Sequence, residues 1–399
     1  MGFRMLTLST KDNRSLGAAA LSGSLILRVT TNPFYPQALR DKCALLLPDS
    51  QLKISPGFAA TLIRSTHPEA GRKECGAILI SDSLGHVTDG DVIKISPDLR
   101  ISCMYRRNAK SNAILVTERC NSFCLMCSQP PRDIDDSYRF AEWMRAIPLF
   151  DRDTPEVCIT GGEPTLLGAD LFHLVRALQC QLPETSLHIL SNGRNFQDLA
   201  LASQLASVGH HDLMLGVPLY ADVASIHDYV VQADGAFDET IKGILNLKRC
   251  GVRVEIRVVI HKATYKRLPA LARFIVRNLQ FVDQVALMGL EITGFTKANL
   301  DELWIDPIDY KSELAEAATI LRRGSVRAVI YNHQLCLIDR KLWPISAKSI
   351  SEWKNEYMPE CSGCAAISEC GGFFSSAHIK RSPNISPIRQ PQLDEVTSN

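Results

Sequence analysis

From about residue 113 onward, short apolar segments alternate with longer helical segments, and this alternation restricts the fold more than any other feature of the sequence. Strands that alternate with helices imply a parallel sheet or barrel with the helices outside. Six such strands predict a partial (β/α)6 barrel of the TIM type rather than a closed barrel of eight. The expected strands are 113–117, 156–160, 187–190, 213–219, 252–260 and 285–290. The expected helices lie near 136–147, 168–181, 196–208, 237–250, 266–278 and 309–323.

The alternation covers residues 113–325, and the regions on either side differ from it in composition. Residues 1–112 contain short apolar runs separated by turn residues, which predicts a small β-rich N-terminal domain. That domain carries no chemical motif, so a structural or docking role is the simplest interpretation. Residues 326–380 lose the alternation and carry a group of cysteines, whereas residues 381–399 have the composition of a disordered tail.

The charge and hydropathy of the chain argue against several classes of protein. The 44 basic and 43 acidic residues give a net charge of +1, so no basic field favours a nucleic-acid partner. No apolar run reaches the roughly 18 residues that a membrane span requires. The first residues also lack the apolar core of a secretory signal. We therefore expect a cytoplasmic protein with neither a nucleic-acid nor a membrane partner.

The expected strand at 252–260 alternates between apolar and charged side chains. Arg253, Glu255 and Arg257 point to one face, and valine and isoleucine point to the other. In a barrel, the charged face would line the lumen and would suggest a ligand there. The other interpretation is an edge strand with one solvated face, and the pattern alone does not choose between them.

Three of the thirteen cysteines follow the first expected strand, in the segment Cys120-x3-Cys124-x2-Cys127. Three thiolates at this spacing can bind three corners of a cubane iron–sulfur cluster. The fourth iron would then lack a protein ligand, and an open coordination position is typical of a catalytic metal. A zinc site with a distant fourth ligand and a set of buried free thiols are the alternatives.

A second group of cysteines lies near the C-terminus. Cys361-x2-Cys364-x5-Cys370 and the more distant Cys336 make four thiolates, which is a complete ligand set for a closed site. From spacing alone, a structural zinc ribbon and an iron–sulfur cluster are comparable. We expect the other cysteines to be structural, namely Cys43, Cys75, Cys103, Cys158, Cys180 and Cys250.

The first cysteine segment resembles the signature of the radical SAM superfamily, and a second family signature, Thr160-Gly161-Gly162-Glu163-Pro164, follows at the end of the next expected strand. The resemblance implies a 4Fe–4S cluster on the three cysteines, with S-adenosylmethionine on its open iron. It also implies that the second segment holds the amino group of the cofactor, through its backbone and the Glu163 carboxylate. Glycine permits this close approach, and a carboxylate suits an ammonium group.

The resemblance extends to three more cofactor-binding candidates. Ser191 begins Ser-Asn-Gly after the strand at 187–190, like the polar motif on the fourth strand of many such enzymes. Arg257 matches an arginine that often reaches the cofactor carboxylate. The family residue before the third cysteine is usually aromatic and lies near the adenine, and here it is Met126. A thioether can also pack on a purine, but this departure weakens the expected adenine contact.

The C-terminal cysteines resemble the SPASM and twitch domains that follow some radical SAM barrels and bind auxiliary clusters. A complete SPASM set has seven cysteines, so the resemblance implies a single, twitch-like 4Fe–4S cluster here. Cys361, Cys364 and Cys370 match part of that pattern, and Cys336 is the expected fourth ligand.

A narrower resemblance covers nearly the whole chain. Four features are similar to the HxsC-type maturases of the His-Xaa-Ser peptide system: the β-rich N-terminal segment, TERCNSFCLMCSQPP at 117–131, GVPLY at 216–220 and CGGFF at 370–374. This implies a radical SAM peptide maturase whose 5′-deoxyadenosyl radical abstracts hydrogen from a His-Xaa-Ser repeat peptide. A second radical SAM maturase and a flavodoxin- or ferredoxin-type electron donor are the implied partners. The alternatives are a radical SAM enzyme for a small molecule, as in molybdenum cofactor synthesis, and a non-enzymatic zinc or iron–sulfur protein.

Overall fold

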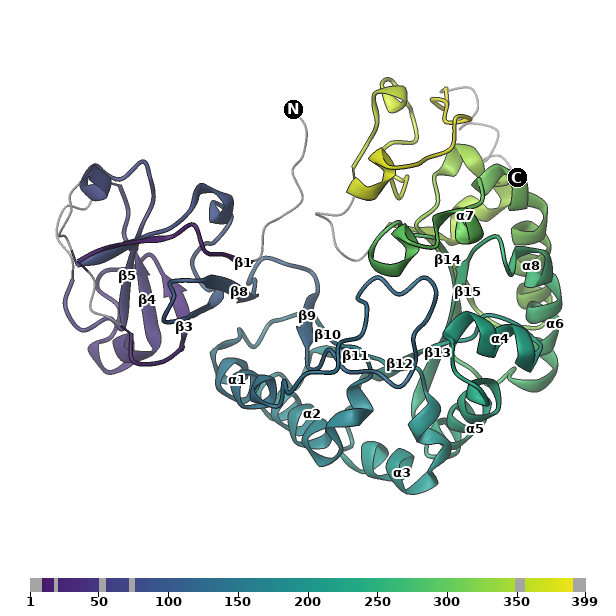
Figure 1. The fold of residues 1–399 in the computed structure, drawn as a ribbon, viewed down its shortest axis with the longest axis horizontal. Helices are drawn as coiled ribbons and strands as arrows, with labels where there is room; N and C mark the ends of the chain where they lie inside the picture. Colours follow the sequence, from purple (N-terminus) through teal and green to yellow (C-terminus); the bar gives the residue numbers. More distant parts are fainter. Residues whose placement is uncertain (1–8, 18–20, 50–54, 72–75, 349–355, 390–399) are drawn as a thin grey trace.

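The computed structural model describes residues 9–17, 21–49, 55–71, 76–348 and 356–389. Within these residues the strands form two eight-stranded sheets, one in the N-terminal region and one in the barrel (Figure 1). Cys75, which we expected to be structural, lies outside the described residues. The same holds for residues 390–399 of the expected disordered tail.

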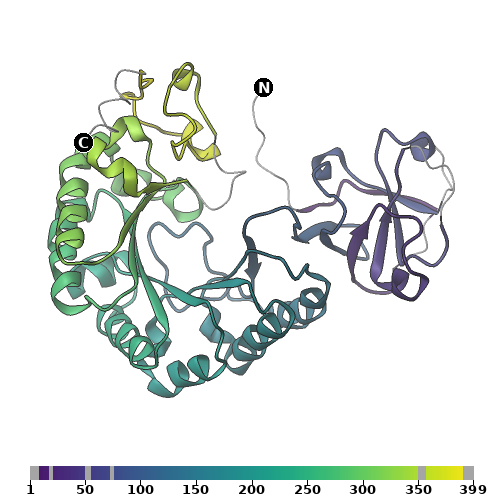
Figure 2. The ribbon, with the colours of Figure 1, turned by 180° about the vertical axis from the view of Figure 1, so that it is seen from behind.

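The second sheet is an open barrel whose strands are all parallel and follow one another in chain order (Figure 2). Its edge strands, the first and the last, do not pair with each other within the described residues, so the expected partial barrel is confirmed. The strands are β9 (Asn112–Leu115), β10 (Glu156–Thr160), β11 (Ser186–Leu190), β12 (Leu213–Pro218), β13 (Arg253–Ile260), β14 (Gln284–Gly289), β15 (Ala328–Tyr331) and β16 (Ser346–Ala347).

The number of barrel strands differs from the expected six, because β15 and β16 extend the sheet into the region where we expected the alternation to be lost. These strands have four and two residues, respectively. Segments so short carry little periodicity of their own, and these two lack the alternation with helical segments that marked β9, which also has four residues. Pairing with β14 holds β15 in place, and this tertiary contact has no local signal.

Most of the helices cover the outer surface of the barrel sheet (Figure 1). In chain order, the α-helices are α1 (Tyr138–Ala146), α2 (Ala169–Gln181), α3 (Leu199–Ser207), α4 (Ala224–Val231), α5 (Ala236–Arg249), α6 (Leu268–Asn278), α7 (Leu300–Leu303) and α8 (Lys311–Arg323). The short α7 is an exception, because its Leu303 packs with Met126 of the first cysteine loop. In α5, Ile244 and Leu247 are fully buried, and acidic residues in the first turn and basic residues in the last complement the helix dipole. Among the described residues, no helix combines the length and the apolar character that crossing a membrane requires.

Strand β13 lies in the interior of the sheet, because it pairs with β12 on one side and β14 on the other. Glu255 is only 2% exposed, and Arg257 is partly buried. The charged face of this strand therefore lines the lumen, and the interpretation as an edge strand is wrong.

The N-terminal sheet confirms the expected β-rich character. Its strand order is β1-β8-β7-β3-β4-β5-β6-β2, with parallel pairing from β3 to β6 and antiparallel pairing elsewhere. Leu27, Val29, Ile93 and Ile95 are in its core. The strands are β1 (Ser9–Thr10), β2 (Arg14–Leu16), β3 (Leu25–Thr30), β4 (Cys43–Leu46), β5 (Ala60–Ile63), β6 (Ala77–Leu79), β7 (Val92–Ile95) and β8 (Ile101–Tyr105).

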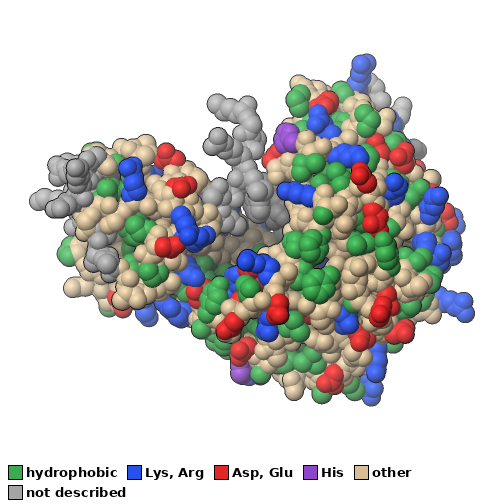
Figure 3. Space-filling view, in the orientation of Figure 1, with side chains coloured by type: hydrophobic (Ala, Val, Ile, Leu, Met, Phe, Trp, Pro, Cys, Tyr) green, Lys and Arg blue, Asp and Glu red, His purple; other side chains and the backbone are tan. Residues whose placement is uncertain are grey.

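This sheet packs against the edge of the barrel near β9. The ring of Tyr105 stacks on Phe150 with centroids 4.3 Å apart, and its hydroxyl lies 2.9 Å from the Thr154 hydroxyl. Arg28 forms a 2.8 Å ion pair with Asp151. In the space-filling view the N-terminal sheet forms a separate lobe, and charges of both signs are interspersed over this face (Figure 3).

The segment after β16 contains little regular structure, but part of the expected disordered tail is ordered against it. Ser382 and Ile388 are buried, and the Ala365 amide donates a 2.8 Å hydrogen bond to the Ile388 carbonyl. The expectation of disorder is therefore wrong for residues 381–389. Burial of one isoleucine and a backbone hydrogen bond to a distant loop are tertiary effects that composition does not report.

Candidate functional site

The segments that follow β9, β10 and β11 meet at one edge of the barrel sheet, because these strands are parallel neighbours. Two backbone hydrogen bonds join the first two segments. The Gly162 amide donates to the Thr117 carbonyl, and the Glu163 amide donates to the Arg119 carbonyl, each at 2.8 Å. The cysteine segment and the Thr-Gly-Gly-Glu-Pro segment thus form one joined structure at the carboxyl ends of the strands, where ligands bind in parallel α/β folds.

The two glycines of this structure leave no room for a side chain. A Cβ atom on Gly162 would lie 2.1 Å from the Arg119 carbonyl oxygen, and one on Gly161 would lie 2.6 Å from the Thr117 carbonyl oxygen. Both obstacles are backbone atoms, which cannot move aside as a flexible side chain does. The glycines are therefore required for the contact between the two loops.

Glu163 joins the ends of β10 and β11. Its side chain is 0% exposed, and burial raises its pKa. One carboxylate oxygen accepts hydrogen bonds from the Thr165 amide (3.0 Å), the Thr165 hydroxyl (2.6 Å) and the Ser191 hydroxyl (2.8 Å). The other oxygen accepts from the Asn192 amide at 2.7 Å. Pro164 follows as the first residue of a 3-10 turn, Pro164–Leu167. A contact between Glu163 and the cofactor amino group stays a prediction.

Replacing Glu163 by glutamine is expected to lower the free energy of unfolding by about 1–3 kcal/mol, because the new amide group cannot satisfy every donor that now surrounds the carboxylate. Thermal unfolding followed by circular dichroism measures this change. Glu316→Gln is the matched control, since that side chain is 57% exposed and its ion pair with Arg273 contributes little. Equal unfolding midpoints for the two variants would contradict a joining role for Glu163.

The three cysteines after β9 are partly buried free thiols. Burial is the largest effect on each, and it raises the pKa of Cys120 to about 11 and that of Cys124 to about 12. The Cys127 thiol donates a 3.0 Å hydrogen bond to the Gln129 carbonyl. Thiols in this environment remain protonated at neutral pH, whereas a bound metal would displace their protons.

Backbone and amide groups from two other parts of the barrel hold the cysteine loop. The Leu125 amide donates to the Val230 carbonyl at the end of α4, at 2.9 Å. The Asn299 side chain donates to the Leu125 carbonyl at the same distance. Met126 is 7% exposed and belongs to an apolar cluster that contains Tyr220 and Val230. The expected contact between Met126 and adenine stays a prediction.

Arg257 lies on the lumen face of β13, but its guanidinium group has protein partners. One nitrogen donates to the Glu255 carboxylate at 2.9 Å, and another lies 3.3 Å from the Met288 sulfur. His188 lies nearby, and burial lowers its pKa to about 4. A cofactor carboxylate would therefore have to share or displace the Glu255 contact.

The second group of cysteines lines one cavity of about 330 Å³. Cys336, Cys361, Cys364 and Cys370 all contribute to its wall, together with apolar side chains such as Ile367 and Ile388. The Ile388 amide donates a 3.3 Å hydrogen bond to the Cys364 sulfur. The structure thus brings together the four thiols that the sequence separates.

Both groups fit an iron–sulfur cluster by their donor chemistry, because each offers three or four thiols without disulfide bonds around a partly apolar space. Within the described ranges, no three His, Cys, Asp or Glu side chains converge in a way that could hold a single metal ion. A cubane cluster does not require such convergence, since each thiolate binds a different iron.

Sequence reasoning missed Asn192 and Tyr220 as site residues. The Asn192 side-chain nitrogen lies 4.0 Å from the Cys120 sulfur, and its backbone amide binds Glu163. Tyr220 is buried beside Cys124 and Cys127. Asn192 lies inside the Ser-Asn-Gly motif, so its position beside Ser191 was a usable signal. Tyr220 had a weaker signal, as the last residue of GVPLY after a strand.

Comparison with known proteins identifies the central region. Residues 114–275 match the family model described as Radical SAM superfamily. The Fe-coproporphyrin III synthase of Methanosarcina barkeri is 24% identical over 213 residues, which cover 49% of this chain and 47% of that protein. A probable GTP 3′,8-cyclase of Methanopyrus kandleri is 28% identical over 228 residues, which cover 55% and 70%. The chain spans about half the length of the first of these relatives.

Solved structures resemble the chain as well. One, described as native anSMEcpe with bound AdoMet, has a TM-score of 0.49 and 14% identity, over 72% of this chain and 96% of that one. Streptococcus suis SuiB bound to S-adenosylmethionine has a TM-score of 0.47 and 18% identity, over 56% and 51%. On the match of its sequence to the family model, residues 114–275 of this chain form a radical SAM superfamily domain.

Proposed function

We propose that this protein is a radical SAM enzyme that modifies a peptide. Support comes first from the single structure formed by the cysteine loop, the Gly161-Gly162-Glu163 segment and Ser191 at the carboxyl edge of the sheet. A 4Fe–4S cluster with S-adenosylmethionine supplies, when bound, a 5′-deoxyadenosyl radical able to abstract hydrogen from an unactivated carbon. Cys120, Cys124 and Cys127 are the residues that would hold this cluster.

The residues around the cluster loop would bind and orient the cofactor. The backbone of Gly161 and Gly162 approaches the loop without side chains, and the Gly162 amide binds the loop directly, so the two segments are held together at the edge of the sheet. Glu163 and Ser191 fix the relative positions of two strand ends. Arg257 would offer a cation to the cofactor carboxylate from the lumen face. Buried neighbours such as Tyr220 keep water from the inner side of the loop.

The peptide substrate in this proposal rests on the resemblance to the maturases of the His-Xaa-Ser system and on the open barrel. The edge strands β9 and β16 leave the barrel unclosed in the described structure. An extended peptide can enter an open barrel more easily than it could enter a closed barrel. The relatives named Fe-coproporphyrin III synthase and probable GTP 3′,8-cyclase favour a small-molecule substrate as the second candidate.

The test is an anaerobic assay of the full-length protein reconstituted with iron and sulfide. With S-adenosylmethionine and a strong reductant, we expect 5′-deoxyadenosine to be detected by mass spectrometry. Adding a synthetic His-Xaa-Ser repeat peptide should then change the mass of that peptide. Consumption of GTP or of an iron porphyrin with no change in the peptide would favour the second candidate. A sample loaded with iron that forms no deoxyadenosine with any of these compounds would overturn the proposal.

We further propose that the four cysteines of the C-terminal cavity hold an auxiliary 4Fe–4S cluster. Replacing Cys364 by alanine is expected to remove about four iron atoms per chain. Deoxyadenosine formation should persist, because the first cluster lies in a different loop, and modification of the repeat peptide should be lost. Iron analysis and the two mass assays measure these effects. Cys250→Ala, at the end of α5, is the control. An unchanged iron content in the Cys364 variant would contradict the assignment.

A further inference from the structure

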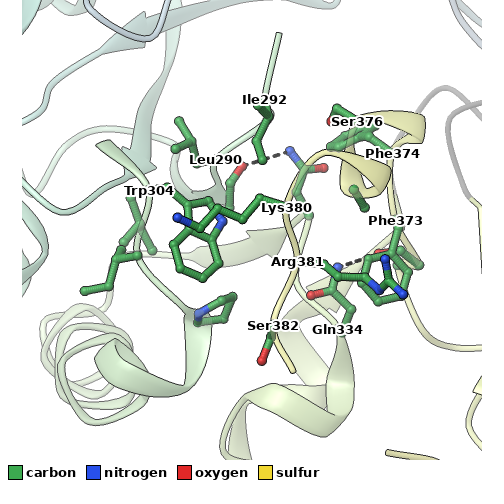
Figure 4. Close-up of a pocket in the computed structure, with 18 of the residues that line it drawn as sticks. Leu290, Ile292, Trp304, Gln334, Phe373, Phe374, Ser376, Lys380, Arg381 and Ser382 are labelled. Atoms are coloured by element: carbon green, nitrogen blue, oxygen red, sulfur yellow. Dashed lines mark hydrogen bonds between the residues drawn. The ribbon is translucent and has the colours of Figure 1, made fainter. Parts of the chain in front are cut away.

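A second, larger cavity of about 700 Å³ lies between the barrel and the segment that follows the C-terminal cysteines (Figure 4). Its barrel side is formed by residues at or just after the ends of β13, β14 and β15, among them Ile260, Leu290 and Gln334. The other side is formed by residues 371–382. None of these residues belongs to the cofactor-binding segments described above.

This cavity adjoins the C-terminal cysteine cavity, and one segment of its wall also contacts the first cysteine loop. The segment 290–304 contacts the first cysteine loop at its middle, where the Phe295 amide donates a 2.9 Å hydrogen bond to the Cys127 carbonyl. The two ends of the same segment line the cavity, with Leu290 at one end and Trp304 at the other. Gln334 and Phe373 line both this cavity and the one that contains the four C-terminal cysteines. A molecule bound here would therefore lie beside the C-terminal cysteines and against the ends of the segment whose middle contacts the first cysteine loop.

The lining of the cavity combines apolar surface with positive charge. Trp304, Phe373 and Phe374 supply aromatic surface, and Lys380 and Arg381 supply two cations, with no aspartate or glutamate among the lining residues. A site with this composition attracts an anion that carries an apolar group.

The two cations differ in their partners. Arg381 forms a 2.8 Å ion pair with Glu360, so most of its charge is already compensated. The Lys380 ammonium lies 4.3 Å from the centre of the Trp304 ring, and its side chain extends toward that ring (Figure 4). Within the described part of the chain, no carboxylate lies within ion-pair distance of Lys380. This lysine can therefore pair with an incoming anion without breaking an existing ion pair.

We propose that this cavity binds a carboxylate group of the peptide substrate together with an adjacent apolar side chain. Lys380 is the counter-ion of the carboxylate, and Trp304 and Phe373 form the apolar wall. The carboxylate is either an acidic side chain or the C-terminus of the peptide, since both present the same group. The proposal rests on the proposed peptide-modifying function, whereas its test does not depend on turnover.

Binding of small probes measures the preference for a carboxylate directly. Isothermal titration of the full-length, anaerobically purified protein, without reductant or S-adenosylmethionine, compares 3-phenylpropionate with 3-phenylpropanamide. We expect the acid to bind about tenfold more tightly than the amide, a ratio typical of one charge-assisted hydrogen bond. Lys380→Met should remove this preference and Lys380→Arg should keep it. Lys242→Met, an exposed position on α5, is the matched control and should match the wild type.

Three dipeptides then separate the possible sources of the carboxylate. N-acetyl-Phe-Glu-amide carries it on a side chain, N-acetyl-Phe-Gln carries it at the C-terminus, and N-acetyl-Phe-Gln-amide has none. Tighter binding of either acid than of the neutral dipeptide supports the proposal and identifies the source. Equal affinity for all three, or a preference that Lys380→Met leaves intact, would overturn it. Because no cofactor is cleaved in these titrations, a negative result here is distinguishable from a failure of the deoxyadenosine assay.

Discussion

Replacing Cys124 by alanine is expected to reduce the formation of 5′-deoxyadenosine to the level of a sample without protein. The thiol lies in the loop that follows β9, beside Tyr220, and its two nearest cysteine neighbours in the sequence are Cys120 and Cys127. With two thiolates remaining, an iron of the proposed cluster would lose its protein ligand, and the cluster would be lost or altered. Deoxyadenosine measured by mass spectrometry, with iron analysis on the same sample, follows both effects.

Cys180→Ala is the matched control for this experiment. Cys180 is exposed on α2 and belongs to neither group of cysteines, so its variant should keep the iron content and activity of the wild type. A Cys124 variant that forms deoxyadenosine at the rate of the Cys180 variant would show that the loop does not hold the catalytic cluster. Loss of activity in both variants would instead indicate a general sensitivity of the fold to cysteine replacement.

The second large effect is expected for Gly162→Ala, which should lower the rate of S-adenosylmethionine cleavage about ten- to a hundredfold. The added methyl group would lie 2.1 Å from the Arg119 carbonyl oxygen and 3.0 Å from the Cys120 Cβ. One of the two loops must therefore move away from the other. Overpacking of this kind costs about 1–3 kcal/mol, and that energy corresponds to the stated change in rate if it acts on the transition state.

The rate of deoxyadenosine formation at several cofactor concentrations, together with the iron content, measures the effect of Gly162→Ala. Gly23→Ala is the control, because no atom lies within 4 Å of the position that its Cβ would take. We expect Gly23→Ala to behave as the wild type in both measurements. If the Gly162 variant equals this control in iron content and rate, the close contact between the two loops has no role in the reaction.

Much of the barrel could be predicted because its determinants are local. The first six strands of the barrel, β9 to β14, and the helices from α1 to α8, except for α4 and α7, are encoded by runs of apolar residues and by helical periodicity within a single segment. The positions of the cysteine loop and of the Gly-Gly-Glu segment at strand ends followed from the same pattern. Strands β15 and β16 escaped prediction, because they lie where the alternation of apolar and helical segments was no longer recognised; β15 has four residues, as does the predicted β9, and β16 has two.

Several partners of the charged side chains could not be predicted, since they come from other strands or from the segments that follow them, although Glu255 lies on the same strand as Arg257 and Thr165 is two residues from Glu163. Arg257 was expected to reach the cofactor, and the structure pairs it with Glu255 and Met288. Glu163 was expected to meet an ammonium group, and the structure surrounds its carboxylate with donors from Thr165, Ser191 and Asn192. A motif specifies the residue types, but which donor lies nearest depends on the register of neighbouring strands.

By itself, then, the sequence determined the class of fold, the order of the barrel elements and the two groups of cysteines, because each depends on residues that are close along the chain. Only the tertiary structure decided that Cys336 joins Cys361, Cys364 and Cys370 around one cavity. It also decided that Lys380 lies over Trp304, 76 residues earlier, in a cavity without acidic residues. These contacts depend on long-range packing between the barrel and the C-terminal segment, and such packing leaves no periodic pattern in the sequence.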